Sequence, residues 1–287
     1  MSLTYINKPN CFILGAGKSG TTSLYYHMKE HPEIFLTEVK EPTFFSEGFQ
    51  VIKNPIKYFE LYDLVSTERI IGEASHAYLS NPTTAKVLKA LFPESKFIVI
   101  LRNPADRAYS LYHHMRREGY EHINTFEAAL EAEELRFTSK KFIKNCPQYF
   151  YNFLYFRSGL YGKQLQNYFS MFPKQQFHII KFEEFIADPN SHFNAIFQFL
   201  GVESDFTPQL DLHNAGKMTT RCPKAQYFVR TKITRLRVVK RLLWSLLKRV
   251  NMTKIPPMTK ETRELLLDRY AADLELLSDM TGISFLE

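Results

Sequence analysis

Cysteine and long apolar runs are both scarce in this sequence of 287 residues. The three cysteines, Cys11, Cys146 and Cys222, are widely spaced and form no Cys-x-x-C pair, which argues against a zinc site or a disulfide framework. The sequence leaves open whether Cys146 and Cys222 form a disulfide. No apolar run approaches the ~20 residues that span a membrane, and Met1–Asn10 lacks the charged-then-apolar pattern of a signal peptide. We therefore expect a cytoplasmic protein with no metal and no transmembrane segment.

Acidic residues are absent from one long stretch near the C-terminus. From Leu212 to Lys260 the sequence has thirteen Lys and Arg but no Asp or Glu, although the net charge of the whole chain is only +7. The remaining residues therefore carry a net charge of about −6. Such an asymmetry favours an anionic ligand or partner held against the basic region. No nucleic-acid-reading motif accompanies the charge, so we expect no sequence-specific nucleic-acid binding.

The chain also lacks internal repeats and low-complexity linkers, and its 45% hydrophobic content is ample for a core. Apolar segments predict strands at 11–14, 34–36, 69–73, 96–101 and 176–181. Helices are predicted at 24–30, 55–64, 81–91 (with Asn81 as N-cap), 104–117, 125–137, 148–169, 191–200, 225–250 and 260–280, and residues 206–223 are predicted as irregular. A break near Gly159 in the 148–169 helix stays open, as does a division of 225–250 into two helices. The alternation predicts an α/β fold, with a central and mostly parallel sheet flanked by helices.

A glycine-rich loop joins the first strand to the first helix. Glycines let backbone N–H groups approach an oxyanion, and a helix N-terminus adds partial positive charge. Lys18 adds a full positive charge. The predicted anion-binding residues of this loop are Gly17, Lys18, Ser19, Gly20, Thr21, Thr22 and Ser23.

Two common nucleotide motifs fit the loop poorly. Gly15 to Gly20 spells G-x-G-x-x-G, but the acid expected about 20 residues later would be Glu38 or Glu41, in a polar segment with a proline rather than at a strand end. A Walker A loop requires a glycine five residues before the Gly-Lys pair, and Phe12 stands there.

A second anion site is predicted where the 96–101 strand ends. Arg102 follows this strand, and Ser110 lies eight residues later on the next helix. Two helical turns cover about seven residues, so both side chains can point to one side. A guanidinium and a hydroxyl can together clamp a phosphate. Asn103 and Pro104 provide the signals of a helix start.

The two sites together resemble a known family. Lys18-Ser-Gly-Thr-Thr22 and Ile100-Leu-Arg-Asn-Pro-Ala-Asp-Arg-Ala-Tyr-Ser110 are similar to the donor motifs of sulfotransferases that use 3′-phosphoadenosine 5′-phosphosulfate (PAPS). Residues 156–202 resemble the second half of the heparan-sulfate-type and bacterial branch. The resemblance covers roughly 12–202.

This resemblance implies a P-loop-NTPase-like sulfotransferase fold in a single domain, 1–287. Residues 1–202 would form the PAPS-binding α/β core, and residues 203–287 the basic loop and C-terminal helices. The loop would hold the 5′-phosphosulfate of the co-substrate PAPS, and Arg102 and Ser110 its 3′-phosphate. Lys217 and Arg221, in the basic loop, would close over that phosphate.

Two residues compete for the role of catalytic base, with Lys18 expected to act on the breaking bond. Glu41 lies in Lys40-Glu-Pro-Thr-Phe-Phe45, which resembles the element that carries the family's base. His76 replaces a family proline, and Ala74 replaces a family lysine. We treat Glu41 and His76 as joint candidates and expect Glu73 to orient a neighbour. His113 and His114 are predicted to lie on a helix surface.

The predicted activity is sulfuryl transfer from PAPS to an acceptor hydroxyl, with release of 3′,5′-diphosphoadenosine. A glycan, a lipid, a polyketide and a small phenol all stay open as acceptors, and the acceptor could be anionic or bound to a carrier protein. The alternatives are a P-loop-like nucleotide kinase, an NAD-binding Rossmann protein and a non-catalytic anion-binding module that uses the basic 225–250 helix. The oligomeric state stays open.

Overall fold

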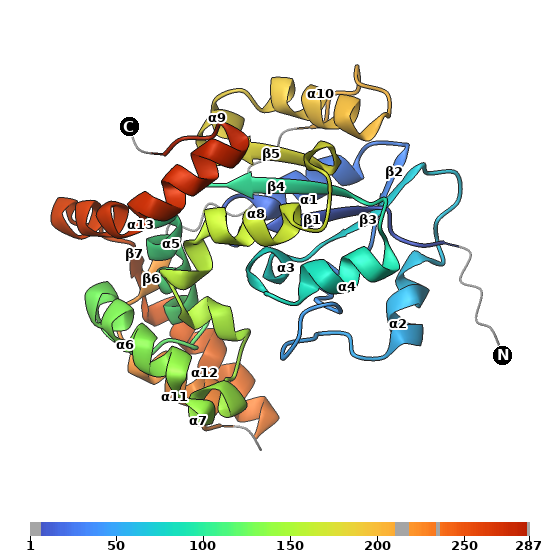
Figure 1. The fold of residues 1–287 in the computed structure, drawn as a ribbon. Coiled ribbons are helices and arrows are strands. Elements are labelled where there is room, and N and C mark those ends of the chain that lie inside the picture. Colours follow the sequence, from blue (N-terminus) through green and yellow to red (C-terminus); the bar gives the residue numbers. More distant parts are fainter. Residues whose placement is uncertain (1–6, 210–217, 234–235, 286–287) are drawn as a thin grey trace.

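A five-stranded parallel sheet forms the centre of the molecule (Figure 1). The structure is a computed structural model that describes residues 7–209, 218–233 and 236–285. The strands run in the order β2-β3-β1-β4-β5. Their bounds are β1 Cys11–Gly15, β2 Ile34–Leu36, β3 Ile70–Ala74, β4 Lys96–Leu101 and β5 Phe177–Lys181. The predicted α/β class and the parallel sheet are therefore confirmed.

Helices cover both faces of this sheet. The α-helices are α1 Thr21–Lys29, α2 Pro55–Phe59, α3 Ala77–Ser80, α4 Thr84–Leu91, α5 Pro104–Arg117, α6 Phe126–Thr138, α7 Lys140–Asn145, α8 Tyr161–Phe169, α9 Phe182–Ala187, α10 Pro189–Leu200, α11 Pro223–Thr231, α12 Arg237–Val250 and α13 Lys260–Thr281. Short 3₁₀ turns lie at Glu60–Tyr62, Phe150–Phe153, Arg157–Gly159 and Lys174–Gln176. A small antiparallel ladder pairs β6 Met218–Thr220 with β7 Met252–Lys254.

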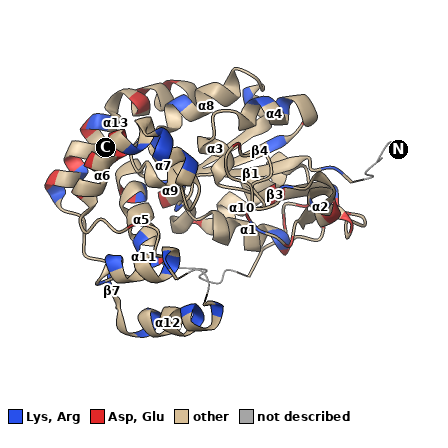
Figure 2. Cartoon of the chain, turned by 90° about the horizontal axis from the view of Figure 1, so that it is seen from below, with Lys and Arg blue, Asp and Glu red and all other residues tan. Residues whose placement is uncertain are grey.

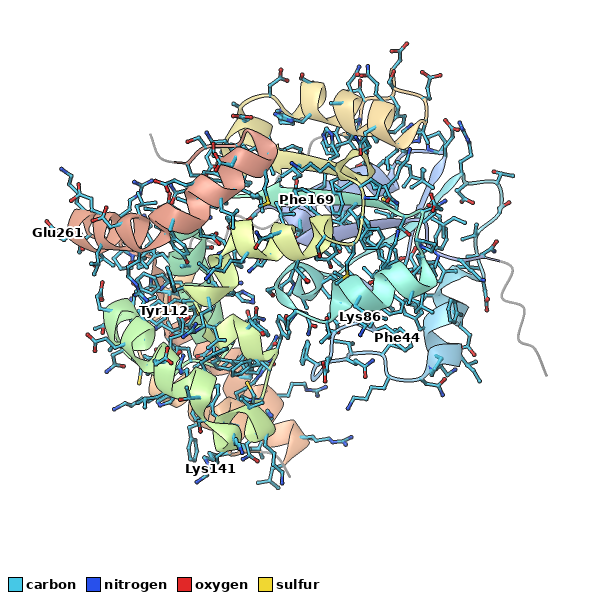
Figure 3. The ribbon with its side chains drawn as sticks, in the orientation of Figure 1. Phe44, Lys86, Tyr112, Lys141, Phe169 and Glu261 are labelled. Atoms are coloured by element: carbon cyan, nitrogen blue, oxygen red, sulfur yellow. The ribbon has the colours of Figure 1, made fainter. Side chains whose placement is uncertain are left out.

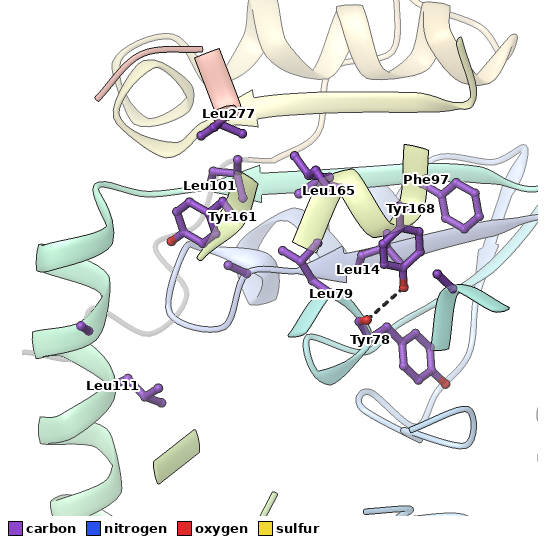
Figure 4. Close-up of a cluster of buried hydrophobic side chains, with 14 of the residues drawn as sticks. Leu14, Tyr78, Leu79, Phe97, Leu101, Leu111, Tyr161, Leu165, Tyr168 and Leu277 are labelled. Carbon is purple, nitrogen blue, oxygen red and sulfur yellow. Dashed lines mark hydrogen bonds between the residues drawn. The ribbon is translucent and has the colours of Figure 1, made fainter. Parts of the chain in front are cut away.

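The alternation of side chains along β4 builds two cores. Ile98 and Ile100 belong to the core that includes residues of α1 and α10. Phe97 and Leu101 point to the opposite face, whose core includes residues of α8 and α13 and is drawn in Figure 4. In that core the Tyr168 hydroxyl donates to the Tyr78 carbonyl at 2.9 Å. Successive strand residues face opposite sides of a sheet, so the apolar run from Phe97 to Leu101 fits a strand buried on both faces.

The charged residues lie mostly at the periphery. Tyr112 of α5 is buried in the interior, whereas Lys141 and Glu261 extend outward from α7 and α13 (Figure 3). Cys146 and Cys222 are free thiols, so the disulfide left open by the sequence is not formed.

The predicted helix over 148–169 is interrupted near Gly159, as the sequence left open, and its first half is wrong because that part is not α-helical. Only α8 is α-helical there, because distant side chains take the backbone groups that a continuous helix would pair. The Arg107 guanidinium donates to the Tyr155 carbonyl at 2.6 Å, and the Tyr270 hydroxyl donates to the Phe156 carbonyl at 2.9 Å. Glu133 accepts the N–H groups of Phe156 and Arg157.

The 225–250 segment forms two helices, α11 and α12, which is one of the two outcomes that the sequence left open. Two further predictions needed correction. The stretch predicted as irregular, 206–223, contains strand β6. Asn81 does not cap the next helix: its side chain accepts from the N–H of Thr83, and α4 begins only at Thr84.

Candidate functional site

The glycine loop lies at the carboxyl end of β1, as the sequence predicts. The Ala16 N–H donates to the Ile100 carbonyl at 2.7 Å, which ties the loop to β4. Lys18 and Gly20 have positive φ angles of 72° and 91°. Helix α1 starts directly after Gly20. The first N–H groups of a helix have no partner within it, so those of α1 can bind an anion at this turn.

Lys18 sits among other cations. Burial, together with the charges of Arg117, Arg102 and Lys40, lowers the pKa of its ammonium group to about 8, against the opposing effect of Glu118. These residues come from four separate segments of the chain. An excess of positive charge around one half-buried ammonium is the field expected of a site for a polyanion.

Arg102 lies beside the same loop. Its guanidinium lies over the Phe182 ring, 5.3 Å from the centroid. The same ring closes over Gly20, where an added Cβ would lie 2.9 Å from Phe182 Cε2. Phe182 therefore links the glycine loop to Arg102, and the structure brings the two predicted anion sites to one edge of the sheet.

Helix α5 starts where the sequence predicts and carries Ser110. The Asn103 side chain accepts from the N–H groups of Ala105 and Asp106, and Pro104 is the first helical residue. Ser110 is half-buried two turns later. The cap at Asn103 fixes the backbone next to Arg102 and so helps to aim its side chain.

Glu41 and His76, which the sequence leaves as rivals, form one hydrogen-bonded pair. His76 Nδ1 and the His76 backbone N–H both lie 2.8 Å from Glu41 Oε2. Glu41 Oε1 also accepts from Lys40 Nζ at 2.6 Å. Burial alone would raise the pKa of Glu41, but the charges and hydrogen bonds of His76 and Lys40 outweigh it and lower the pKa to about 2. Glu41 is therefore ionised at neutral pH.

The His76 ring packs against the glycine loop. A Cβ added to Gly17 would lie 2.8 Å from His76 Cδ2 and 3.6 Å from Nε2. Only glycine leaves room for the imidazole here. Because Glu41 holds Nδ1, the Nε2 edge is the one that lies along the loop.

Glu73 lies behind this pair in a closed set of hydroxyl donors. Tyr58 and Tyr78 donate to Oε1 at 2.6 and 2.9 Å, and Ser75 donates to Oε2 at 2.7 Å. Full burial raises the pKa of Glu73 to about 7, although these hydrogen bonds oppose the rise. Ser75 also accepts the N–H of Thr43 at 3.1 Å, in the segment that carries Glu41. Glu73 is thus linked through Ser75 to the segment that carries Glu41.

Helix α5 places residues near Lys18 that the sequence did not predict there. His114 was expected on the surface, but burial and the charges of Lys18 and Arg117 lower its pKa to about 3. Its Nδ1 accepts from Arg117 Nη2 at 3.1 Å. His113 is buried as well, with Nδ1 3.0 Å from Thr219 Oγ1. The spacing of Ser110, His114 and Arg117 places them on one helix face and could have revealed them.

Two further predicted donor residues belong to the basic loop. Lys217 lies outside the described residues. Arg221 is exposed after β6, and its backbone N–H donates to the Asn251 carbonyl at 2.8 Å. Within the described part of the chain, no group of three His, Cys, Asp or Glu side chains is arranged to hold a metal ion. Nor does any helix of that part have the length and apolar character needed to cross a membrane.

Comparisons with known proteins agree with this geometry. The family model described as "Sulfotransferase domain" matches residues 8–232. The membrane-associated sulfotransferase kil1 of Dictyostelium discoideum is 25% identical over 264 residues, which cover 68% of this chain and 56% of that protein. The human bifunctional heparan sulfate N-deacetylase/N-sulfotransferase 2 is 28% identical over 206 residues, covering 68% and 22%. The chain therefore matches about half or less of the length of these curated relatives.

A solved structure covers nearly the whole chain. The sulfotransferase from Alicyclobacillus acidocaldarius superposes with a TM-score of 0.74 and 29% identity, over 97% of this chain and 98% of that one. The predicted P-loop-like sulfotransferase fold is thereby confirmed.

Proposed function

Because the chain belongs to the sulfotransferase domain family, we propose that it transfers a sulfuryl group from PAPS to an acceptor hydroxyl and releases 3′,5′-diphosphoadenosine. The observation that carries this proposal is the position of Phe182, which packs on both Gly20 and Arg102. PAPS has a phosphosulfate at one end and a 3′-phosphate at the other. Two anion sites at one sheet edge suit such a donor.

The donor would be held at two places. The 5′-phosphosulfate lies in the loop, bound by the backbone N–H groups at the start of α1 and by Lys18. Arg102 and Ser110 bind the 3′-phosphate, and Lys217 and Arg221 stay as predicted members of that subsite. The further loop residues assigned to the donor are Gly17, Ser19, Gly20, Thr21, Thr22 and Ser23.

The reaction breaks the bond from sulfur to the phosphate oxygen and forms a bond from sulfur to the acceptor oxygen. Negative charge develops on the released phosphate oxygen, and the Lys18 ammonium stabilises it. Positioning and electrostatics supply most of the catalysis, by analogy with phosphoryl transfer.

The acceptor proton passes to the Glu41–His76 pair. Both oxygens of Glu41 are already engaged, Oε2 by His76 and Oε1 by Lys40, whereas the Nε2 edge of His76 lies along the loop. We therefore assign the proton to His76 Nε2, with Glu41 holding Nδ1 and thereby fixing the ring.

Titration calorimetry with 3′,5′-diphosphoadenosine tests the donor site. Arg102→Ala should abolish detectable binding, whereas Lys18→Ala should keep much of the affinity and lose turnover. Binding of NAD that survives Arg102→Ala would favour a Rossmann protein, and binding of ATP would favour a nucleotide kinase. A chain that turns over no donor with any acceptor would be a non-catalytic anion-binding module.

The acceptor is the open part of the proposal. The two curated relatives are named for membrane association and for N-sulfation of heparan sulfate, so lipids and glycans come first in a screen with labelled PAPS, followed by polyketides on carrier proteins and small phenols. The single-domain assignment, with a core at 1–202 and a basic part at 203–287, and the cytoplasmic location stay predictions. Limited proteolysis and cell fractionation would test them.

A further inference from the structure

Helix α12 presents an apolar face that the described part of the chain leaves uncovered. Six side chains on the helix or at its start are between 43% and 64% exposed: Leu236, Val238, Val239, Leu242, Leu246 and Val250. Val239, Leu242, Leu246 and Val250 follow the spacing of one helix face. A continuous apolar stripe of this kind on a surface helix marks an interaction site.

The neighbouring face of α12 is fastened to the protein. Trp244 packs against Gly119, where an added Cβ would lie 3.0 Å from Trp244 Cη2. Lys240 Nζ donates to the Arg230 carbonyl of α11 at 2.7 Å. The fold therefore fixes which face of α12 points outward. The half-buried residues of the fastened face are Lys240, Leu243, Trp244 and Leu247.

The exposed part of the helix is also strongly basic. Figure 2 shows α12 set apart from the main body, with basic residues and no acidic ones along it. The stretch 212–260 contains no Asp or Glu, so no acid of its own neutralises the helix. The exposed cations of α12 are Arg237, Arg241, Lys248 and Arg249.

We propose that α12 docks on an anionic lipid surface, with its apolar stripe among the acyl chains and its cations at the headgroups. An interfacial helix combines these two features. An anionic polysaccharide would pair with the cations but would leave six apolar side chains in water. The lipid surface is the occupant that satisfies both the charge and the apolar area.

The position of α12 relates this surface to the candidate site. Gly119, against which Trp244 packs, directly follows Arg117 and Glu118, whose charges act on Lys18. Docking would thus hold the glycine loop near the lipid. The inference does not rest on the proposed function, because membrane binding requires neither donor nor turnover.

Vesicle co-sedimentation of the full chain tests the proposal. The wild type should bind vesicles of phosphatidylcholine with phosphatidylserine and should bind pure phosphatidylcholine much more weakly. Leu242→Ser combined with Leu246→Ser should lower the partition coefficient by roughly tenfold or more. Arg241→Gln combined with Arg249→Gln should lower it as well and should weaken its dependence on salt.

The matched control changes two exposed leucines elsewhere. Leu135→Ser with Leu265→Ser, on α6 and α13, should bind vesicles like the wild type. The sequence has a single tryptophan, so unchanged Trp244 emission shows that α12 stays docked in each variant.

Three results would overturn the proposal. The first is a wild-type protein that does not bind anionic vesicles, whether or not it binds heparin or polyglutamate. The second is equal vesicle binding by the wild type and the α12 serine variant. The third is a wild-type protein that is a dimer in lipid-free solution while the same serine variant is a monomer, since the apolar stripe would then join two copies of this chain.

Discussion

At the scale of single residues, the candidate site depends on pairs that lie far apart in the sequence. Glu41 and His76 are 35 positions apart, yet they share a 2.8 Å hydrogen bond. The sequence could identify both as candidates, because each stands in a short motif. It could not identify the pair, because the contact depends on how the segment before Phe44 returns to the end of β3, where the Glu41 N–H donates to the Ala74 carbonyl.

The pair leads to a prediction about turnover. His76→Ala and Glu41→Gln should each lower kcat by about 10²-fold or more, as loss of a general base does. Steady-state rates at saturating PAPS measure the change. His122→Ala, at an exposed histidine, is the control and should keep the wild-type rate. A His76→Ala variant with an unchanged kcat would remove His76 from the role of base.

Glu73 leads to a prediction about stability. Its pKa is about 7 in the folded chain against 4.5 ordinarily, so its protonated form is the one that stabilises the fold. This contribution is complete below about pH 4.5 and is lost as the pH rises to about 7; the difference amounts to about 3 kcal/mol. In urea unfolding, the unfolding free energy of the wild type should fall relative to that of Glu73→Gln as the pH rises over this range. A difference between the two proteins that does not change with pH would contradict the raised pKa of Glu73.

At the scale of elements, local signals succeeded where a segment forms its structure from its own residues. The apolar run of β4 and the Asn103-Pro104 start of α5 are of this kind, and both were predicted at the right positions. The 148–169 segment is different, because Arg107, Glu133 and Tyr270 take its backbone groups from outside. Propensity within the segment carries no information about those partners.

Helix α9 holds the two anion sites together through its first residue, Phe182. Phe182→Ala should weaken binding of 3′,5′-diphosphoadenosine by roughly tenfold, because Arg102 loses a cation–π contact and the Gly20 turn loses its cover. Calorimetry measures the change. Phe199→Ala is the matched control, since Phe199 also lies beneath a cation, Lys96, but in another part of the molecule. If both variants lose the same affinity for the nucleotide, the effect of Phe182→Ala reflects a general loss of stability and not the contact with Arg102.

At the scale of the whole molecule, the fold brings together positive charges that lie far apart in the sequence. Lys40, Arg102 and Arg117 come from separate segments, and the charge of each acts on Lys18. In the sequence the basic excess lies in 212–260 instead, where a plain count of charges is highest. A count along the chain misses a cluster that the fold assembles from distant segments.

A ligand that bridges these segments should therefore stabilise the whole fold. At a concentration of 100 Kd, 3′,5′-diphosphoadenosine should raise the unfolding free energy by about 2.7 kcal/mol, which a thermal-shift assay detects as a higher Tm. Arg102→Ala should lose most of this rise at the same concentration. Adenosine 5′-monophosphate, which has no 3′-phosphate, should give a smaller rise that is the same in both proteins. If the two nucleotides stabilise the wild type equally, Arg102 contacts no 3′-phosphate, and the glycine loop alone binds the nucleotide.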